Sequence, residues 1–357
     1  MLKSLVSIVL AIVALLLVAT HYENVQPLGF ETTSTEVPKT RLVVVWVDSL
    51  AQDDVESGTG MPLLRSHLDS ALHGPVRECT DAISVPCFTA MTTGLDNFSL
   101  GALWSNHGGA GGLSSGSVLR ALKDNGLRLG FIADSKITPV AAGLDWVLSE
   151  TEIDDALTLQ RAAQALDDER LDVMIVQMRH LDQVSHRLRP DSDAYAEALD
   201  LTDTLIEDLR KKLRPDDHFI VLGDHGHDAL GRHFSGLGVP TYPAFWGPLF
   251  DRPLKRAMAM TDHASLWGRI FGVRFGDVPW IDAYFAGEEV PTVTTLPALT
   301  SSAAPMSVGR ALIALGLLLV AVMIAASTRT SLGASPKLVL IVALGLLAAA
   351  VLGATFS

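Results

Sequence analysis

RLVVVWV, residues 41–47, sets the fold class of this chain. The run is apolar and mostly β-branched on both faces, as expected of a strand that is covered on both sides. The runs LRLGFIA (127–133), LDVMIVQM (171–178) and HFIVLG (218–223) have much the same character. We therefore expect four central strands in one buried sheet.

Helical patterns lie between these runs, over residues 156–170 and 192–213. The second pattern carries Arg210, Lys211 and Lys212 in its last turn, where the helix dipole favours cations. Strands that alternate with helices predict an α/β fold with a mostly parallel sheet and helices on both faces. In such folds, ligands bind at the carboxyl ends of the strands.

Length and charge narrow the classes of function. The chain has 357 residues, enough for a sizeable core, and a formal net charge of -13. Because nothing resembles a basic face that follows a phosphate backbone, we exclude a nucleic-acid partner. Polar segments over residues 21–40 and 287–307 read as linkers, so we expect one catalytic domain over residues 41–286.

The apolar run at the start of the chain, residues 4–20, is either a signal-peptide core or a signal anchor. The Ala-Thr-His sequence at its end is a poor peptidase site. We therefore favour an uncleaved transmembrane anchor over residues 1–20.

Two further apolar runs predict transmembrane helices over residues 308–327 and 338–356. The loop between them, residues 328–337, carries Arg329 and Lys337, so the positive-inside rule places this loop in the cytoplasm. The catalytic domain is then expected on the extracytoplasmic side, in the periplasm or at the cell surface. A pair of buried core helices is the alternative interpretation of these two runs.

Acidic and imidazole side chains follow three of the predicted strands. They are Asp48 after the first strand, Asp182 and His186 after the third, and Asp224, His225 and His233 after the fourth. Each feature alone is weak, because an Asp after a strand is commonly a turn or helix-capping residue. Several carboxylates at one edge of a sheet repel one another, and a bound cation would relieve that repulsion.

The ligand types suggest which cation. Carboxylate and imidazole ligands without thiolates suit Zn²⁺, or Mn²⁺ as the second choice. The set is too large for one catalytic ion with an open position. It suits two divalent ions about 4 Å apart, which clamp the attacking and leaving oxygens in phosphoryl displacement.

The segment CTDAISVPCFTAMTTG, residues 79–94, is rich in hydroxyl and thiol groups and offers several nucleophiles. Cys87 is a rival of the hydroxyls because thiolates are nucleophilic, and Thr80 and Thr89 remain further alternatives. Cys79 and Cys87 could be free thiols, or in an oxidising compartment a disulfide that stiffens the loop.

These motifs together resemble the alkaline phosphatase superfamily, and within it the phosphodiesterase branch of nucleotide pyrophosphatase/phosphodiesterases and GPI ethanolamine-phosphate transferases. The matching elements come in the family's order: VVVWVDSL, Ser84-Val85-Pro86 leading to Thr93-Gly94, DQVSHR and GDHGH. Ser185 and His227 stand where the family usually has Gly and Met. The family's later His-Gly-Gly is matched only loosely, at His233.

The resemblance implies a role for each residue. It makes Ser84 the nucleophile and Asn106 the amide donor to a phosphate oxygen. One metal ion would be held by Asp48, Asp224, His225 and the Ser84 oxygen, and the second by Asp182, His186 and His233. For the last of these ligands, His263 is a competitor.

The implied function is a membrane-anchored, two-metal phosphoric ester hydrolase with a covalent phosphoserine intermediate. Its substrate would be a phosphate ester, linked in one version to a lipid or a glycan. The alternative is a transferase that moves a phosphoethanolamine-type head group onto a glycan or lipid. A sulfatase-like hydrolase is disfavoured because Cys87-Phe88 replaces the Ser-Arg of that motif, and an inactive scaffold is the remaining alternative.

Overall fold

The computed structural model describes residues 30–32, 39–57, 60–77, 79, 82–95, 116–152, 154–233, 239–293 and 295–296. These residues belong to one compact unit, Gln26–Leu299. The predicted transmembrane segments over 1–20, 308–327 and 338–356 lie outside them, as does Asn106. None of the helices built from the described residues is long and apolar enough to cross a membrane.

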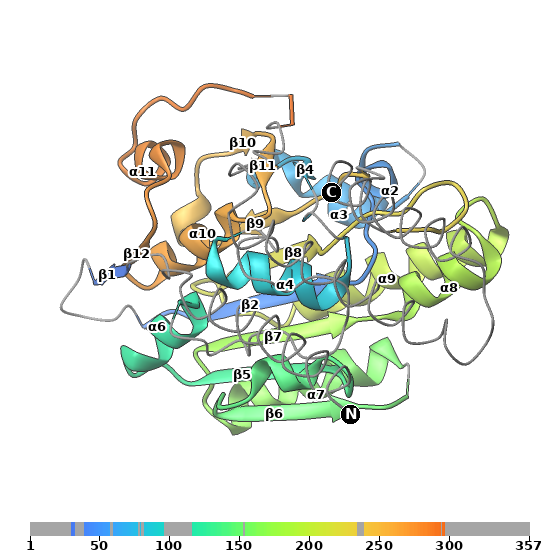
Figure 1. The fold of residues 1–357 in the computed structure, drawn as a ribbon, viewed down its shortest axis with the longest axis horizontal. Helices are drawn as coiled ribbons and strands as arrows, with labels where there is room; N and C mark the ends of the chain where they lie inside the picture. The colour runs from blue at the N-terminus through green and yellow to red at the C-terminus, as the bar shows by residue number, and fades with distance from the viewer. Residues whose placement is uncertain are drawn as a thin grey trace, which may run out of the picture. The chain divides into compact units, whose positions relative to one another are not determined.

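Within the described residues the central sheet has eight strands in the order β10-β3-β9-β8-β2-β7-β5-β6 (Figure 1). The strands from β8 to β6 in this order pair in parallel, whereas β9 pairs antiparallel with β8 and with β3. The predicted mostly parallel sheet is therefore confirmed. Its strands are β2 (Leu42–Val47), β3 (Leu72–His73), β5 (Leu129–Asp134), β6 (Trp146–Glu150), β7 (Val173–Met178), β8 (His218–Gly223), β9 (Ala244–Trp246) and β10 (Leu254–Lys255).

Two small ribbons accompany the central sheet. β1 (Phe30–Thr32) pairs antiparallel with β12 (Val273–Phe275), and β4 (Val76–Arg77) pairs parallel with β11 (Met258–Ala259). β1 comes from the segment predicted as a linker, so part of that segment is paired with the globular unit.

Helices cover both faces of the sheet. They are α2 (Gln52–Glu56), α3 (Pro62–Ser66), α4 (Ser84–Thr93), α6 (Val118–Asp124), α7 (Asp155–Asp168), α8 (His180–Leu188), α9 (Asp193–Arg210), α10 (Asp262–Ile270) and α11 (Pro279–Phe285), with short 3-10 turns at Leu68–Ser70, Thr138–Ala141 and Pro248–Phe250. Alternate side chains of β2 enter two hydrophobic cores. Leu42, Val44 and Trp46 pack in the core that contains α4, α6, α10 and α11, while Val43, Val45 and Val47 pack with α3, α7 and α9.

This arrangement explains why the first strand is apolar throughout: each of its six residues is fully buried. The four predicted strands and both predicted helices are confirmed, with ends that shift by a few residues. The edge strand β6 was not predicted, because its side chains alternate between half-buried and exposed positions and include polar residues.

Candidate functional site

Three adjacent strands deliver the predicted metal ligands to one edge of the sheet. β8, β2 and β7 are neighbours, and Val47, the last residue of β2, is in register with both Met178 and Gly223. Because these strands are parallel and end level, the residues that follow them emerge side by side. Asp48 and Asp224 therefore lie next to each other, and α8 begins beside them.

Asp48, Asp224 and His225 form the more buried part of the site. The Nε2 atom of His225 lies 3.4 Å from Asp48 Oδ1 and 3.4 Å from Asp224 Oδ2. The other oxygen of Asp224 accepts hydrogen bonds from the backbone N–H groups of Ser49 and His225 itself. Asp224 Oδ2 and His225 Nε2 therefore face each other in the interior of the protein.

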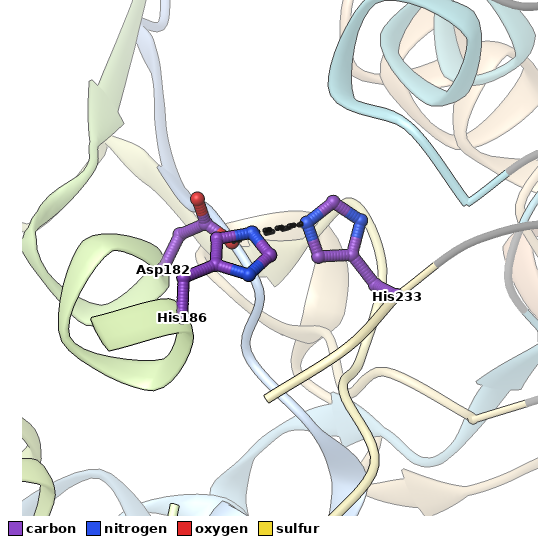
Figure 2. A group of neighbouring side chains, drawn as sticks. All are labelled: Asp182, His186 and His233. Carbon is purple, nitrogen blue, oxygen red and sulfur yellow. Dashed lines mark hydrogen bonds and ion pairs between the residues drawn. The ribbon is translucent and has the colours of Figure 1, made fainter. Parts of the chain in front are cut away.

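Asp182, His186 and His233 form the second part (Figure 2). His186 Nε2 lies 2.9 Å from His233 Nε2, and Asp182 Oδ1 lies 3.4 Å and 3.3 Å from those two nitrogens. Asp182 and His186 lie four positions apart on α8, and this i, i+4 spacing places both side chains on one face of the helix. His233 arrives from the loop after β8, so the group depends on two separate elements.

Two overlapping groups of these side chains have the composition of a metal centre, and the predicted ligand Asp224 belongs to neither of them. Asp182, His186 and His233 can offer ligand atoms within 4.8 Å of one another, and so can Asp48, Asp182 and His225. Asp182 belongs to both groups, whereas the sequence assigned it to the second ion alone. Three buried atoms of the site lack a hydrogen-bond partner among the described residues: Asp182 Oδ1, Asp224 Oδ2 and His225 Nε2.

Such atoms are costly to bury unless something binds them. Their kinds, two carboxylate oxygens and one imidazole nitrogen, are those that a divalent zinc or manganese ion takes. The residues therefore fit a metal ion on their own chemistry.

The electrostatics of the site also favour a bound metal ion. Burial raises the pKa of Asp48 well above its usual range, and the charges of Asp224 and Asp182 raise it further. Burial lowers the pKa of His225. For His233 burial acts downward too, but the neighbouring carboxylate of Asp182 raises its pKa overall. In the inner part of the site, burial thus disfavours both an additional carboxylate charge and a protonated imidazole. A bound cation would stabilise the ionised carboxylates there.

Ser84 faces the inner part of the site. Its Oγ donates to Asp48, with 3.3 Å to Oδ1 and 3.5 Å to Oδ2, and the residue is 5% exposed. Ser84 is the first residue of α4, where the positive end of the helix dipole stabilises negative charge. Among the hydroxyl groups predicted as nucleophiles, Ser84 is therefore the one that the described residues bring to the carboxylates.

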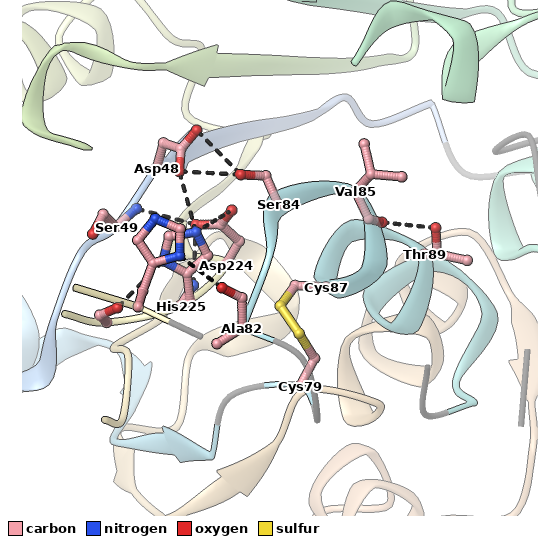
Figure 3. The surroundings of a disulfide bond; sticks show 12 residues. Asp48, Ser49, Cys79, Ala82, Ser84, Val85, Cys87, Thr89, Asp224 and His225 are labelled. Carbon is pink, nitrogen blue, oxygen red and sulfur yellow. Dashed lines mark hydrogen bonds and ion pairs between the residues drawn. A yellow bond between two sulfur atoms is a disulfide. The ribbon is translucent and has the colours of Figure 1, made fainter. Parts of the chain in front are cut away.

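The loop before α4 is closed by a disulfide between Cys79 and Cys87 (Figure 3). Cys87 is thereby removed as a thiolate nucleophile. Thr89 uses its hydroxyl within α4, donating to the Val85 carbonyl, and Thr80 lies outside the described residues. Of the two alternatives that the sequence left open, free thiols or a disulfide, the structure shows the disulfide.

The same loop also supports the second ligand group. Ala82 adopts a positive φ of 46° and accepts a hydrogen bond of 2.7 Å from His233 Nδ1. That bond fixes the tautomer of His233 and turns its Nε2 toward Asp182. One short segment thus places both Ser84 and the partner of His233.

His263 lies elsewhere. It is fully buried on α10, its Nδ1 donates to the Met260 carbonyl, and its ring packs 5.7 Å from the ring of Phe245. Neither ligand group contains it, so the competition with His233 favours His233 on geometry. Asn106 lies outside the described residues, and its predicted role stays a prediction.

The sequence reasoning missed Gln177. Its Nε2 donates to Asp48 Oδ2 at 2.7 Å, and the side chain is 1% exposed. The available signal was a single amide in an otherwise apolar strand, at a position next to the strand end.

Comparison with known proteins supports the resemblance. The family model for type I phosphodiesterase / nucleotide pyrophosphatase matches residues 133–236, a range that contains the predicted ligands from Asp182 to His233. GPI ethanolamine phosphate transferase 2 of Yarrowia lipolytica is 22% identical over 283 residues, which cover 75% of this chain and 32% of the relative. The chain thus spans about a third of that relative's length.

Solved structures share the fold. A protein of the alkaline phosphatase superfamily from Vibrio parahaemolyticus has a TM-score of 0.53 and 16% identity, with 70% of each chain covered. Murine ectonucleotide pyrophosphatase / phosphodiesterase 5, as an inactive variant in complex with AMP, has a TM-score of 0.51 and 13% identity, with 68% of this chain and 96% of that chain covered. The similarities support the prediction of an enzyme of phosphoryl transfer or phosphate-ester hydrolysis. The chain has the alkaline phosphatase fold, and its sequence resembles the type I phosphodiesterase / nucleotide pyrophosphatase branch of that superfamily.

Proposed function

We propose that this chain is a membrane-anchored phosphoric ester hydrolase of the phosphodiesterase or phosphatase type, with two divalent metal ions and Ser84 as nucleophile. The observation that carries the proposal is the hydrogen bond from Ser84 to Asp48, a member of one of two ligand groups that share Asp182. A nucleophile, a buried carboxylate cluster and unpartnered ligand atoms at one sheet edge are the parts that phosphoryl transfer needs.

The ligands divide between two sites. One ion would be held by Asp48, Asp224, His225 and the Ser84 oxygen, and the other by Asp182, His186 and His233. When bound, divalent ions supply Lewis-acid charge that acidifies a coordinated hydroxyl and stabilises the negative oxygens of the transferred group. Zn²⁺ is the preferred ion and Mn²⁺ the second choice, because the ligands are oxygen and imidazole without thiolate.

Ser84 performs the covalent step. Its oxygen forms the bond to phosphorus while the bond from phosphorus to the leaving oxygen breaks. The Ser84 proton passes to Asp48, the acceptor of its hydrogen bond, and the departing alkoxide takes a proton from water. The amino end of α4 lies at the attacking oxygen and favours the charge that develops there. Asn106 would donate its amide to a phosphate oxygen. Water then resolves the phosphoserine in the hydrolase.

The location of the protein is part of the proposal. The segments 1–20, 308–327 and 338–356 would anchor it in a membrane, with the catalytic domain of residues 41–286 on the extracytoplasmic side and the loop 328–337 in the cytoplasm. The Cys79–Cys87 disulfide supports this location, because disulfides form and persist in oxidising compartments and are rare in the cytosol.

A transferase is the second candidate. The similarity to GPI ethanolamine phosphate transferase 2 of Yarrowia lipolytica extends over 75% of this chain and favours it. In that version an acceptor alcohol on a glycan or lipid resolves the phosphoserine in place of water. AMP in the complex of the murine structure supports a nucleotide-type phosphate ester as the substrate of the hydrolase version.

The test is turnover and metal content measured together on the full chain in detergent. With Zn²⁺ or Mn²⁺ the wild type should hydrolyse a chromogenic phosphate mono- or diester and hold about two ions per chain. Asp224→Ala should lose one ion and nearly all turnover. Unchanged metal content and turnover in Asp224→Ala would show that this site is not the catalytic one.

An added alcohol separates the two candidates. A transferase should move the phosphoryl-linked head group onto the alcohol at the expense of release into water, while a hydrolase should release the same amount of product with or without it.

A further inference from the structure

Gln177 joins two neighbouring strands at the candidate site through its side chain. It stands one residue before the end of β7, in register with Trp46 of β2. Its Nε2 donates to Asp48 Oδ2 at 2.7 Å, and its Oε1 accepts from the backbone N–H of Asp134 on β5 at 3.1 Å. The amide therefore spans from β5 across β7 to the first ligand of the metal site.

The two partners fix the direction of the amide. The backbone N–H of Asp134 can only donate, so the end of the side chain that faces it must be the oxygen. The nitrogen is then the end that faces Asp48, where it donates to the carboxylate. A flipped amide would lose both bonds, and at 1% exposure no water outside the protein could replace them.

Because Gln177 binds only one of them, the two oxygens of Asp48 have different contacts. Oδ2 accepts from Gln177 at 2.7 Å and lies 3.5 Å from Ser84 Oγ, while Oδ1 lies 3.3 Å from Ser84 Oγ and 3.4 Å from His225 Nε2. The backbone of Asp48 is also held, because its N–H donates to Met178 on the same strand as Gln177. The carboxylate is thus held in one orientation, in which Oδ1 is the oxygen closer to the Ser84 hydroxyl and to His225 Nε2. Figure 3 draws the contacts of both oxygens with Ser84.

We propose that Gln177 is a positioning residue of the metal site, which holds the Asp48 carboxylate so that one oxygen is free for a metal ion and for Ser84. This inference rests on the proposed function, since it concerns the same ligands. Partners that orient a metal ligand typically contribute 10- to 100-fold to metal affinity. Gln177 acts through Asp48, because its amide nitrogen donates to that carboxylate and its amide oxygen accepts from the backbone N–H of Asp134.

Zinc affinity of the full chain, measured by competition with a chromophoric chelator, tests this role. Gln177→Met keeps the volume and removes the donor, so one of the two zinc ions should bind about 10- to 100-fold more weakly. Gln177→Glu keeps the shape but sets a carboxylate against Asp48, and should weaken the same ion at least as much at neutral pH. The second variant also decides the question if the first does not fold.

A matched control separates positioning from the loss of a buried hydrogen bond. Thr202→Val removes a buried hydroxyl that donates to the Ala198 carbonyl within α9, and it should leave the affinity for both zinc ions unchanged. The zinc-free thermal midpoint of each variant reports any general destabilisation.

The outcomes are distinct. Zinc affinities within twofold of the wild type in the folded Gln177 variants would overturn the role of Gln177 and leave the proposed function standing. A wild type that binds no zinc and no manganese would overturn the proposed function itself, and the inference with it.

Discussion

His186 Nε2 and His233 Nε2 lie 2.9 Å apart, although the two residues are separated by 47 positions in the sequence. His233 is turned to this position by its bond to the Ala82 carbonyl. Two imidazole nitrogens at this distance share one proton or face a common cation. Asp182 Oδ1 lies within 3.4 Å of both nitrogens, so the three side chains form one ligand group.

This relationship predicts the effect of removing either imidazole. His186→Ala and His233→Ala should each lower the zinc content from two ions to one and reduce turnover by about 100-fold or more, since one ion alone cannot clamp both reacting oxygens. Elemental analysis of the purified variants and turnover of a chromogenic diester measure both effects.

His263→Gln is the control for these two variants. His263 is buried on α10 outside both ligand groups, so this variant should keep two zinc ions and its turnover even if it is less stable. Loss of one ion in His263→Gln, with full metal content in His233→Ala, would exchange the roles of the two histidines.

The disulfide should stabilise both the fold and the site. Cys79 and Cys87 close a loop with a sequence separation of 8, for which the chain-entropy estimate gives about 2.5 kcal/mol. The double variant Cys79→Ala/Cys87→Ala should lose about this much free energy of unfolding in denaturant titrations. Its turnover should fall as well, because the loop carries both Ser84 and the carbonyl that orients His233.

Treatment of the wild type with a reductant should reproduce both losses, and reductant should leave the double variant unaffected. Full activity in the reduced protein would mean that the core contacts of α4 alone hold Ser84 in place.

Stability should fall with acid through two histidines outside the ligand groups. Burial lowers the pKa of His218 to about 4 and that of His263 to about 4, from an ordinary value of about 6.5. In this window the unfolded chain binds protons that the folded chain does not. The free energy of unfolding should therefore be greatest above about pH 6.5 and fall by up to about 3 kcal/mol per histidine as the pH drops to about 4.

Denaturant titrations of the metal-free protein between pH 7 and pH 4 measure this fall. His218 donates from Nδ1 to Thr40 and accepts at Nε2 from the N–H of Leu249, as a neutral ring does. His218→Gln should flatten the pH dependence in that window. An equal slope in wild type and variant would assign the acid lability to other groups.

The buried hydroxyl of Tyr195 should contribute to the stability of the fold but not to metal binding. Tyr195 Oη donates to Asp54 Oδ2 at 2.8 Å and also lies in hydrogen-bond contact with His227. Tyr195→Phe should cost about 2 kcal/mol, since it leaves a buried carboxylate without one of its donors. The zinc content should stay at two ions, and a loss of zinc in this variant would link the Tyr195 group to the metal site.

Much of the fold was predictable because it depends on burial. β2 lies in the middle of the sheet with helices on both faces, so its sequence is apolar at every position, and the parallel order then follows from the alternation with helices. The positions of Asp48 and Asp224 followed as well, because parallel strands that end level bring their next residues together. β6 escaped prediction since an edge strand needs only alternate apolar residues.

Other parts of the site depend on contacts that no local pattern encodes. The bond from Gln177 to Asp48 joins residues 129 positions apart, and the bond from His233 to Ala82 joins residues 151 positions apart. Asp182 reaches both ligand groups because α8 follows β7, the strand that pairs with β2. The state of the two cysteines was open for the same reason: the sequence gives their spacing but not the turn that brings them together.

Mass spectrometry of the acid-quenched protein tests whether Ser84 is the nucleophile. The zinc-loaded full chain is quenched during turnover of a chromogenic phosphodiester, and its peptides are mapped. If Ser84 is the nucleophile, we expect a phosphate-ester adduct on the peptide that contains it, and neither adduct nor turnover in Ser84→Ala with its other zinc ligands intact. Wild-type turnover in Ser84→Ala, with no adduct in either protein, would contradict it.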